Sequence, residues 1–150
     1  MGVFVSRIAA AVAVFLAAFF FLSAAESPAE PEKTAEVALG GASFRVSVAY
    51  TPTLRARGLS GARGLSSDEG MLFVFDSPGR YAFWMKDMLF PIDIVWISEA
   101  GEVVGVEKNV RPDSYPRTFS PPADILFALE IPAGAAEENG ITPGLRMRFE

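Results

Sequence analysis

The chain begins with one long apolar run and continues with short runs in which apolar and polar residues alternate. The long run covers residues 8–22, follows the single basic residue Arg7, and ends before the triplet Ser-Ala-Ala at residues 23–25. A basic start, an apolar stretch and small residues around a cleavage point are typical of a secretory signal peptide. The pattern predicts a signal peptide over residues 1–25 and a mature protein that is exported to the periplasm or the extracellular space.

An uncleaved N-terminal membrane anchor is the alternative, and it is the one route by which we expect contact with a membrane. A spanning helix needs about 20 apolar residues, and the run approaches that length only if it extends back past Arg7 to Val3. The next segment, residues 26–33, is acidic and contains two prolines and one small apolar residue. It buries too little apolar surface to offset the entropy of ordering. We therefore predict a flexible acidic tether there and a folded domain over residues 34–150.

Within the predicted domain, apolar runs of five to eight residues are separated by turn residues. This spacing is typical of β-sandwiches and barrels. Large apolar residues alternate with polar or small residues over residues 44–50, shortly after Gly40 and Gly41. A period of two next to a Gly-Gly turn predicts a β-hairpin with one buried face.

The dipeptide Thr51-Pro52 predicts the start of a short helix, because threonine caps helix N-termini and proline fits the first helical position. The helix is expected to end near Gly58 or Gly61. Further elements are predicted as strands at residues 71–75, 81–85, 92–97, 103–107, 125–131 and 145–149, and as a second short helix at residues 133–139. The turn residues at 76–80 favour pairing of the first two of these strands. We predict a compact, mainly β domain, sandwich-like or barrel-like, with one or two short helices.

The composition excludes several kinds of chemistry. The 150-residue chain contains no His and no Cys, which excludes imidazole bases, thiolate nucleophiles, disulfides and ordinary zinc or iron–sulfur sites. Lys and Arg number 13 against 18 Asp and Glu, for a formal net charge of -5. Nucleic acid is not expected as a partner, because phosphate binding needs clustered basic residues.

The methionines Met71, Met85, Met88 and Met147 are the soft donors of the predicted domain. Thioethers can bind Cu(I), but methionine more often fills gaps in an aromatic core. We therefore predict no metal site and no cofactor.

Two acids stand out because each lies between large apolar residues of a predicted strand, namely Asp93 and Glu130. A buried charge is costly unless it is paired, so both carboxylates are expected to have cationic partners. The candidate partners are Arg55, Arg57 and Lys86. One interpretation is a pair of buried ion pairs that fix the strand register. The other is a polar pocket with two carboxylates, as in glycoside hydrolysis.

Trp84 adds an aromatic surface next to these residues, since an exposed indole ring can stack on a sugar. The candidate polar pocket therefore consists of Arg57, Lys86, Asp93, Glu130 and Trp84.

The sequence also resembles the DUF192 family, which is also called UPF0127. The resemblance rests on motifs at residues 55–59 (RARGL), 70–75 (GMLFVF), 83–86 (FWMK), 91–94 (PIDI), 101–104 (GEVV), 129–130 (LE) and 133–134 (AG). It implies a compact, mostly β, sandwich-like fold and no established activity. The family commonly has Met at the position of Ser60 and Asn-Thr at the positions of Asp87 and Met88.

Three functions fit these observations. The first is an exported, non-enzymatic domain that binds an unknown ligand or protein of the cell envelope through the polar pocket. The second is a hydrolase of an envelope saccharide with paired carboxylates, and the third is a purely structural or assembly factor. Carboxyl groups about 5–10 Å apart in one open cleft would favour the hydrolase.

Overall fold

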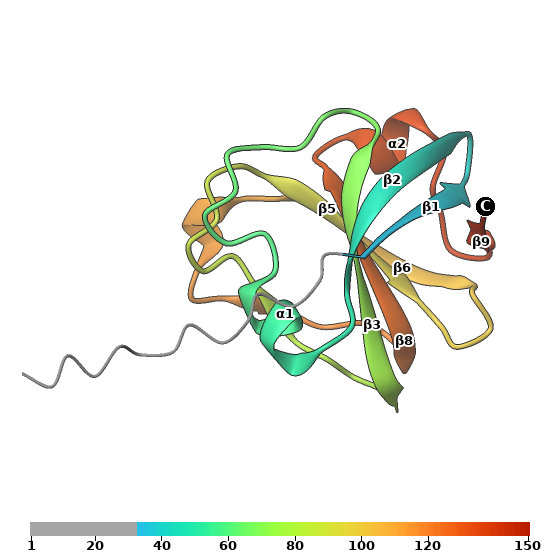
Figure 1. Ribbon diagram of the computed structural model, residues 1–150, viewed down its shortest axis with the longest axis horizontal. Coiled ribbons are helices and arrows are strands. Elements are labelled where there is room, and N and C mark those ends of the chain that lie inside the picture. Colours follow the sequence, from blue (N-terminus) through green and yellow to red (C-terminus); the bar gives the residue numbers. More distant parts are fainter. Residues whose placement is uncertain (1–32) are drawn as a thin grey trace, which may run out of the picture. The chain divides into compact units, whose positions relative to one another are not determined.

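A curled β-sheet forms the framework of the domain (Figure 1). The computed structural model describes residues 33–150, so the predicted signal peptide, its cleavage point and all of the predicted tether except Lys33 lie outside the described residues. The seven strands of this sheet are β1 (Thr34–Leu39), β2 (Ala42–Ala49), β3 (Glu69–Gly79), β5 (Ile92–Ile97), β6 (Val103–Val110), β8 (Ile125–Pro132) and β9 (Arg148–Phe149). A second, two-stranded sheet pairs β4 (Phe83–Trp84) with β7 (Thr118–Phe119).

The order of strands in the large sheet is β6-β5-β8-β3-β2-β1-β9. All neighbouring strands are antiparallel except β2 and β3, which run parallel. The helices are short: α1 (Pro52–Arg57), α2 (Ala135–Glu138) and a single 3-10 turn, η1 (Pro112–Ser114). The prediction of a mainly β domain with one or two short helices is confirmed.

Local signals placed the first elements correctly. β1 and β2 form the predicted hairpin, and Gly40 in its turn adopts a φ of 62°, which is strained for a residue with a side chain. The hydroxyl oxygen of Thr51 accepts a hydrogen bond of 3.2 Å from the backbone N–H of Leu54 and so caps α1. The predicted strands at residues 92–97 and 103–107 are observed as β5 and β6, which pair with each other in antiparallel fashion.

The predicted pairing of residues 71–75 with residues 81–85 is wrong. β3 is already paired on both edges, with β2 on one side and β8 on the other. The turn therefore leads the chain away from the large sheet, and the Tyr81 ring stacks on Phe75 with 3.6 Å between ring centroids. β4 then pairs with β7 in the second sheet.

The two faces of the large sheet carry separate apolar cores. One core includes Leu72, Val95 and Leu129 and is covered by the β1–β2 hairpin, by α2 and by the C-terminal segment. The other includes Phe73, Ile94, Trp96 and Ala128 and is covered by the second sheet and by the segment that follows α1. Among the described residues, no helix is long and apolar enough to cross a membrane.

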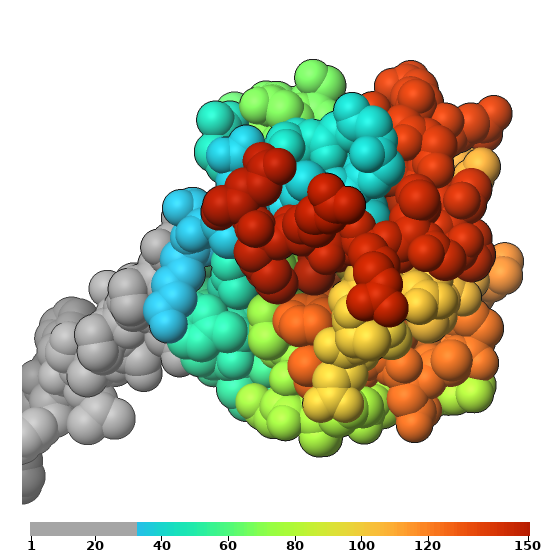
Figure 2. Space-filling model, turned by 90° about the vertical axis from the view of Figure 1, so that its right-hand side faces the viewer, coloured from blue at the N-terminus to red at the C-terminus, as the bar shows by residue number. Residues whose placement is uncertain are grey.

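The C-terminal segment closes the first of these cores. Figure 2 shows it lying across the N-terminal strands and against the segment near residue 100. The predicted strand at residues 145–149 is shorter than expected, since only Arg148 and Phe149 pair with β1. Arg146 instead forms an isolated bridge with Glu102.

The two helices lie at opposite ends of the large sheet (Figure 1). α1 follows β2 and α2 follows β8, and these two strands run in opposite directions because β8 is antiparallel to β3 and β2 is parallel to it. The parallel arrangement also forces the connection from β2 to β3 to cross one face of the sheet. That crossover contains α1 and forms one wall of the site described next.

Candidate functional site

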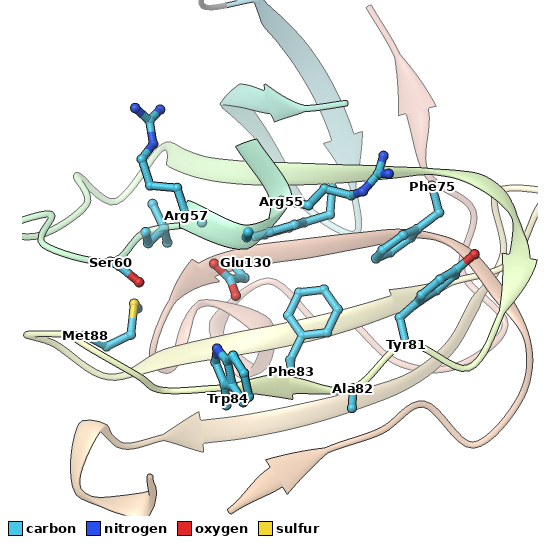
Figure 3. Close-up of a pocket in the computed structure, with 14 residues that line it drawn as sticks. Arg55, Arg57, Ser60, Phe75, Tyr81, Ala82, Phe83, Trp84, Met88 and Glu130 are labelled. Atoms are coloured by element: carbon cyan, nitrogen blue, oxygen red, sulfur yellow. The ribbon is translucent and has the colours of Figure 1, made fainter. Parts of the chain in front are cut away.

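An aromatic pocket of about 310 Å³ lies between the large sheet, the crossover and the second sheet (Figure 3). We define the aromatic pocket by its lining, which consists of residues 55–60, Phe73, Phe75, residues 81–84, Met88 and Glu130. Its volume is at the lower end of the range for small-molecule sites, about 300–1,000 Å³. A single ring with a few substituents fits such a space.

Aromatic rings pack against one another to fix the inner wall. Phe73 meets Phe83 edge to face with 4.9 Å between centroids, and Phe83 meets Phe75 and the buried Trp96 in the same way. The hydroxyl of Tyr81 donates a 2.6 Å hydrogen bond to the carbonyl of Ser77, which holds the ring over Phe75. Edge-to-face pairs of this kind stabilise a fixed arrangement of rings.

The outer edge of the pocket is wider and more exposed. Trp84 is 56% exposed and meets the ring of Tyr115 edge to face at 6.4 Å. Trp84 therefore offers an aromatic surface at the mouth, as its predicted role in stacking requires.

Hydrogen bonds tie the crossover to the turn that follows β4. The hydroxyl of Ser60 donates to the carbonyl of Lys86 over 3.0 Å, and the N–H of Gly61 donates to the carbonyl of Asp87 over 2.9 Å. Asp87 adopts a φ of 57° in this turn. The two places at which the sequence departs from the DUF192 pattern, Ser60 and Asp87-Met88, thus lie side by side, and Ser60 and Met88 both line the aromatic pocket.

Among the residues that the structure describes, Glu130 is the one carboxylic acid that lines the aromatic pocket. It comes from the central strand β8, opposite Met71 of β3 and Ile94 of β5, and is only 6% exposed. Its Oε2 atom is enclosed and has no hydrogen-bond partner within residues 33–150. Burial among apolar side chains raises the pKa of Glu130 from 4.5 to about 8, because the charged form is poorly solvated there. Glu130 is therefore a neutral acid at pH 7.

The arginines of α1 do not pair with Glu130. The Arg55 guanidinium donates to the carbonyls of Tyr50 and Val74 over 3.0 and 2.7 Å and forms an ion pair of 2.9 Å with Asp76. Arg57 is exposed, and Figure 3 shows both guanidinium groups directed away from Glu130. Arg55 therefore fixes α1 against β3, and Arg57 places a positive charge outside the pocket.

Asp93 lies on the other face of the sheet. It is fully buried, and its carboxylate accepts hydrogen bonds from the backbone N–H groups of Asn109, Gly134 and Ala136 over 2.7, 3.0 and 3.0 Å. Asp93 opposes Ile131 and its neighbour Ile94 opposes Glu130, so the two acids point to opposite faces because successive side chains alternate along a strand.

The predicted ion pairs are therefore wrong. In the described part of the chain, three backbone N–H groups donate hydrogen bonds to the Asp93 carboxylate. Glu130 is protonated, so it carries no charge that needs a partner. Neither acid therefore pairs with Arg55, Arg57 or Lys86.

Of the predicted pocket residues, the structure brings together Arg57, Trp84 and Glu130. Asp93 is on the opposite face, and Lys86 is exposed and contributes its backbone carbonyl to the bond with Ser60. The remaining wall residues were not among the predicted pocket residues, and they are Phe73, Phe75, Tyr81 and Phe83. Their alternation with Val74 and Ala82 was visible, but it marks any half-buried strand.

Met71, Met85, Met88 and Met147 are all core residues, as predicted. Met85 and Met88 are both buried in the core beneath the second sheet, and Met147 lies in the core on the other face. In the described part of the chain, no group of three or more His, Cys, Asp or Glu side chains could hold a metal ion.

Comparison with known proteins places the whole domain in one family. Solved structures with a similar fold include one from Sinorhizobium meliloti, described as a candidate transcription regulator. It has 27% identity and a TM-score of 0.75, and the match covers 79% of this chain and 95% of that chain. Another, from Novosphingobium aromaticivorans and described as a protein of unknown function, has 28% identity and a TM-score of 0.75, and the match covers 81% of this chain and 89% of that chain. No curated protein matches. The family model DUF192, described as an uncharacterised ACR, matches residues 35–149, and the chain belongs to this family.

Proposed function

We propose that this domain is an exported binding protein that holds a small molecule of the cell envelope in the aromatic pocket. The observation that carries the proposal is the combination of apolar, aromatic walls with a buried carboxyl group, that of Glu130, which lines the same pocket. Small-molecule sites are commonly built in this way, with a few polar groups that orient a ligand held by apolar contacts. The signal-peptide pattern at residues 1–25 supports an envelope location.

A hydrolase with paired carboxylates is less well supported. Both glycosidase geometries require two carboxyl groups that flank one bond, whereas Asp93 and Glu130 lie on opposite faces of the sheet. A water-activating base is also missing from the pocket, because Glu130 is protonated at neutral pH.

The description of the Sinorhizobium meliloti protein suggests a role in transcription, which the charge of this chain does not favour. A net charge of -5 repels nucleic acid. The apolar, aromatic lining of the pocket is suited to a small molecule and not to the phosphates of DNA.

Native mass spectrometry of the full-length gene product, recovered from its own cell envelope, tests the proposal. We expect a non-covalent small-molecule adduct on the wild-type protein. Ala82 is exposed and lines the pocket, so Ala82→Trp should fill the mouth and abolish the adduct. Ala100 is exposed in the β5–β6 turn, outside the pocket, so Ala100→Trp is the matched control and should keep the adduct. Absence of any adduct, or its retention in Ala82→Trp, contradicts the proposal.

A further inference from the structure

The chemistry at the floor of the aromatic pocket narrows the class of ligand, on the assumption that the proposed binding function is correct. We infer that the ligand is a ring compound that enters with an uncharged carbonyl group first, and that this carbonyl oxygen accepts a hydrogen bond from the Glu130 carboxyl group.

The position of the proton on the Glu130 carboxyl group supports its role as a hydrogen-bond donor to a ligand. Oε2 is enclosed and has no partner, so a proton on this oxygen would be a buried donor with nothing to bind. A proton on the other oxygen leaves Oε2 as an unpaired acceptor, which is the more tolerable state, since under-satisfied acceptors occur more often than orphaned donors. Because Glu130 lines the pocket, its O–H is then available to a ligand acceptor.

The surroundings of Glu130 disfavour a charged head group. The titratable residues that line the pocket are Arg55, Arg57, Tyr81 and Glu130. The Arg55 guanidinium is held by Tyr50, Val74 and Asp76, and Arg57 points away from Glu130 (Figure 3).

Each remaining group is also accounted for. Tyr81 donates to Ser77, and the flanking strands present Met71 and Ile94 beside Glu130. An anion beside Glu130 therefore meets no free cation among the described residues. An ammonium group can pair with Glu130 only after the carboxyl group loses its proton, which is unfavourable below its pKa of about 8. Burial of either charge without a partner is unfavourable.

The walls favour a flat ring behind the carbonyl. Phe73, Phe75 and Phe83 present fixed ring faces and edges, and Trp84 offers a further exposed ring at the mouth. Such surfaces pack well against an aromatic or other flat ring.

Four small probes with the same benzene ring test the inference by NMR titration of the purified full-length protein. They are acetophenone, which carries a pure carbonyl acceptor, ethylbenzene, which has no polar head, benzoate and benzylammonium. The indole N–H signal of Trp84, assigned through Trp84→Phe, reports occupancy of the pocket. At pH 6 we expect acetophenone to bind more tightly than ethylbenzene by about three- to tenfold, the range expected for one net hydrogen bond, and benzoate and benzylammonium to bind more weakly than both.

Variants of Glu130 separate donation from shape. Glu130→Gln keeps an N–H donor, so acetophenone should bind nearly as well as to the wild type, and with no change between pH 6 and pH 9. The wild type should lose the acetophenone preference by pH 9, because an ionised Glu130 cannot donate. Glu130→Leu should bind acetophenone and ethylbenzene equally, while the exposed control Glu36→Gln should behave as the wild type.

The outcomes separate this inference from the proposed function. Equal binding of acetophenone and ethylbenzene to the wild type, or tightest binding of a charged probe, overturns the carbonyl assignment and leaves the pocket as a binding site. Failure of all four probes to shift Trp84 overturns the carbonyl assignment, and the native mass spectra then decide whether the pocket binds anything. The comparison of pH dependence needs only Glu130→Gln, so it stands even if Glu130→Leu does not fold.

Discussion

Substitution of Glu130 by glutamine should change how the stability of the domain depends on pH. Glutamine has nearly the same shape as a protonated glutamic acid but does not titrate. In the folded protein the pKa of Glu130 is raised from 4.5 to about 8 because the carboxyl group is buried. In the unfolded chain the same group is solvated and ionises near its ordinary pKa.

The sign of the effect follows from which state releases the proton first. Below pH 4.5 the carboxyl is protonated in both states, so the wild type has its full stability. Between pH 4.5 and about 8 the unfolded chain ionises while the folded protein does not, so the free energy of unfolding falls as pH rises. Above about pH 8 both states are ionised and the loss is complete.

The size of the loss follows from the two pKa values. At about 1.36 kcal/mol per pH unit, the interval from 4.5 to about 8 corresponds to about 5 kcal/mol, of which about 3 kcal/mol is lost by pH 7. This is a large share of the stability of a small domain, about 5–15 kcal/mol. Glu130→Gln should therefore equal the wild type near pH 4 and exceed its stability by about 3 kcal/mol at pH 7.

Urea unfolding at intervals from pH 4 to pH 9 measures this difference, because titration of all other groups is shared and cancels between the two proteins. The exposed Glu36→Gln serves as the control and should follow the wild type throughout. The difference in the free energy of unfolding between Glu130→Gln and the wild type should grow from pH 4 to pH 8. A difference that stays constant, or that changes in favour of the wild type as pH rises, would refute the conclusion that Glu130 is buried as a neutral acid.

Three other outcomes are expected. Asp93→Asn replaces one carboxylate oxygen by an amide N–H that faces backbone N–H donors, so urea unfolding at pH 7 should show a loss of about 2–4 kcal/mol; a midpoint equal to that of the wild type contradicts this role. The exported protein should begin at Glu26, as intact-mass measurement will show, and retention of Met1 would instead indicate an uncleaved anchor. Competition with a Cu(I) chelator should reveal no stoichiometric copper binding, because Met85 and Met88 are buried in the core; tight one-to-one binding that is lost in Met85→Leu combined with Met88→Leu would overturn that expectation.

Elements with local signals could be predicted from the sequence, whereas those set by distant pairing could not. The Gly40-Gly41 hairpin and the Thr51 cap of α1 depend on neighbouring residues. The partners of β3 are separated from it in the sequence, and one of them, β2, is parallel to it. Turn chemistry at residues 76–80 carried no information about these partners, so the predicted hairpin there was wrong.

The candidate site likewise combines features that the sequence predicts with features that depend on distant strand pairing. Burial of an acid in an apolar strand was readable from the sequence, and both Asp93 and Glu130 are indeed buried. Which face each acid occupies depends on the register between β5 and β8, where Asp93 opposes Ile131 and not Glu130. A shift of one residue that set Asp93 opposite Glu130 would place both acids on the same face. Only the tertiary structure fixes that register.

The lining of the aromatic pocket comes partly from strands and partly from the connections between them, which affects how the pocket can change among related domains. Glu130, Phe73 and Phe75 come from the sheet, whereas residues 55–60 and 81–84 come from connections that leave it. Connections tolerate substitution and changes of length better than the strands they join. The shape of the pocket can therefore change through the crossover and the segment around β4, while the buried acid and the folding of the sheet remain as they are. The same property makes these two segments the natural positions for randomised libraries if the domain is used as an engineered binding scaffold.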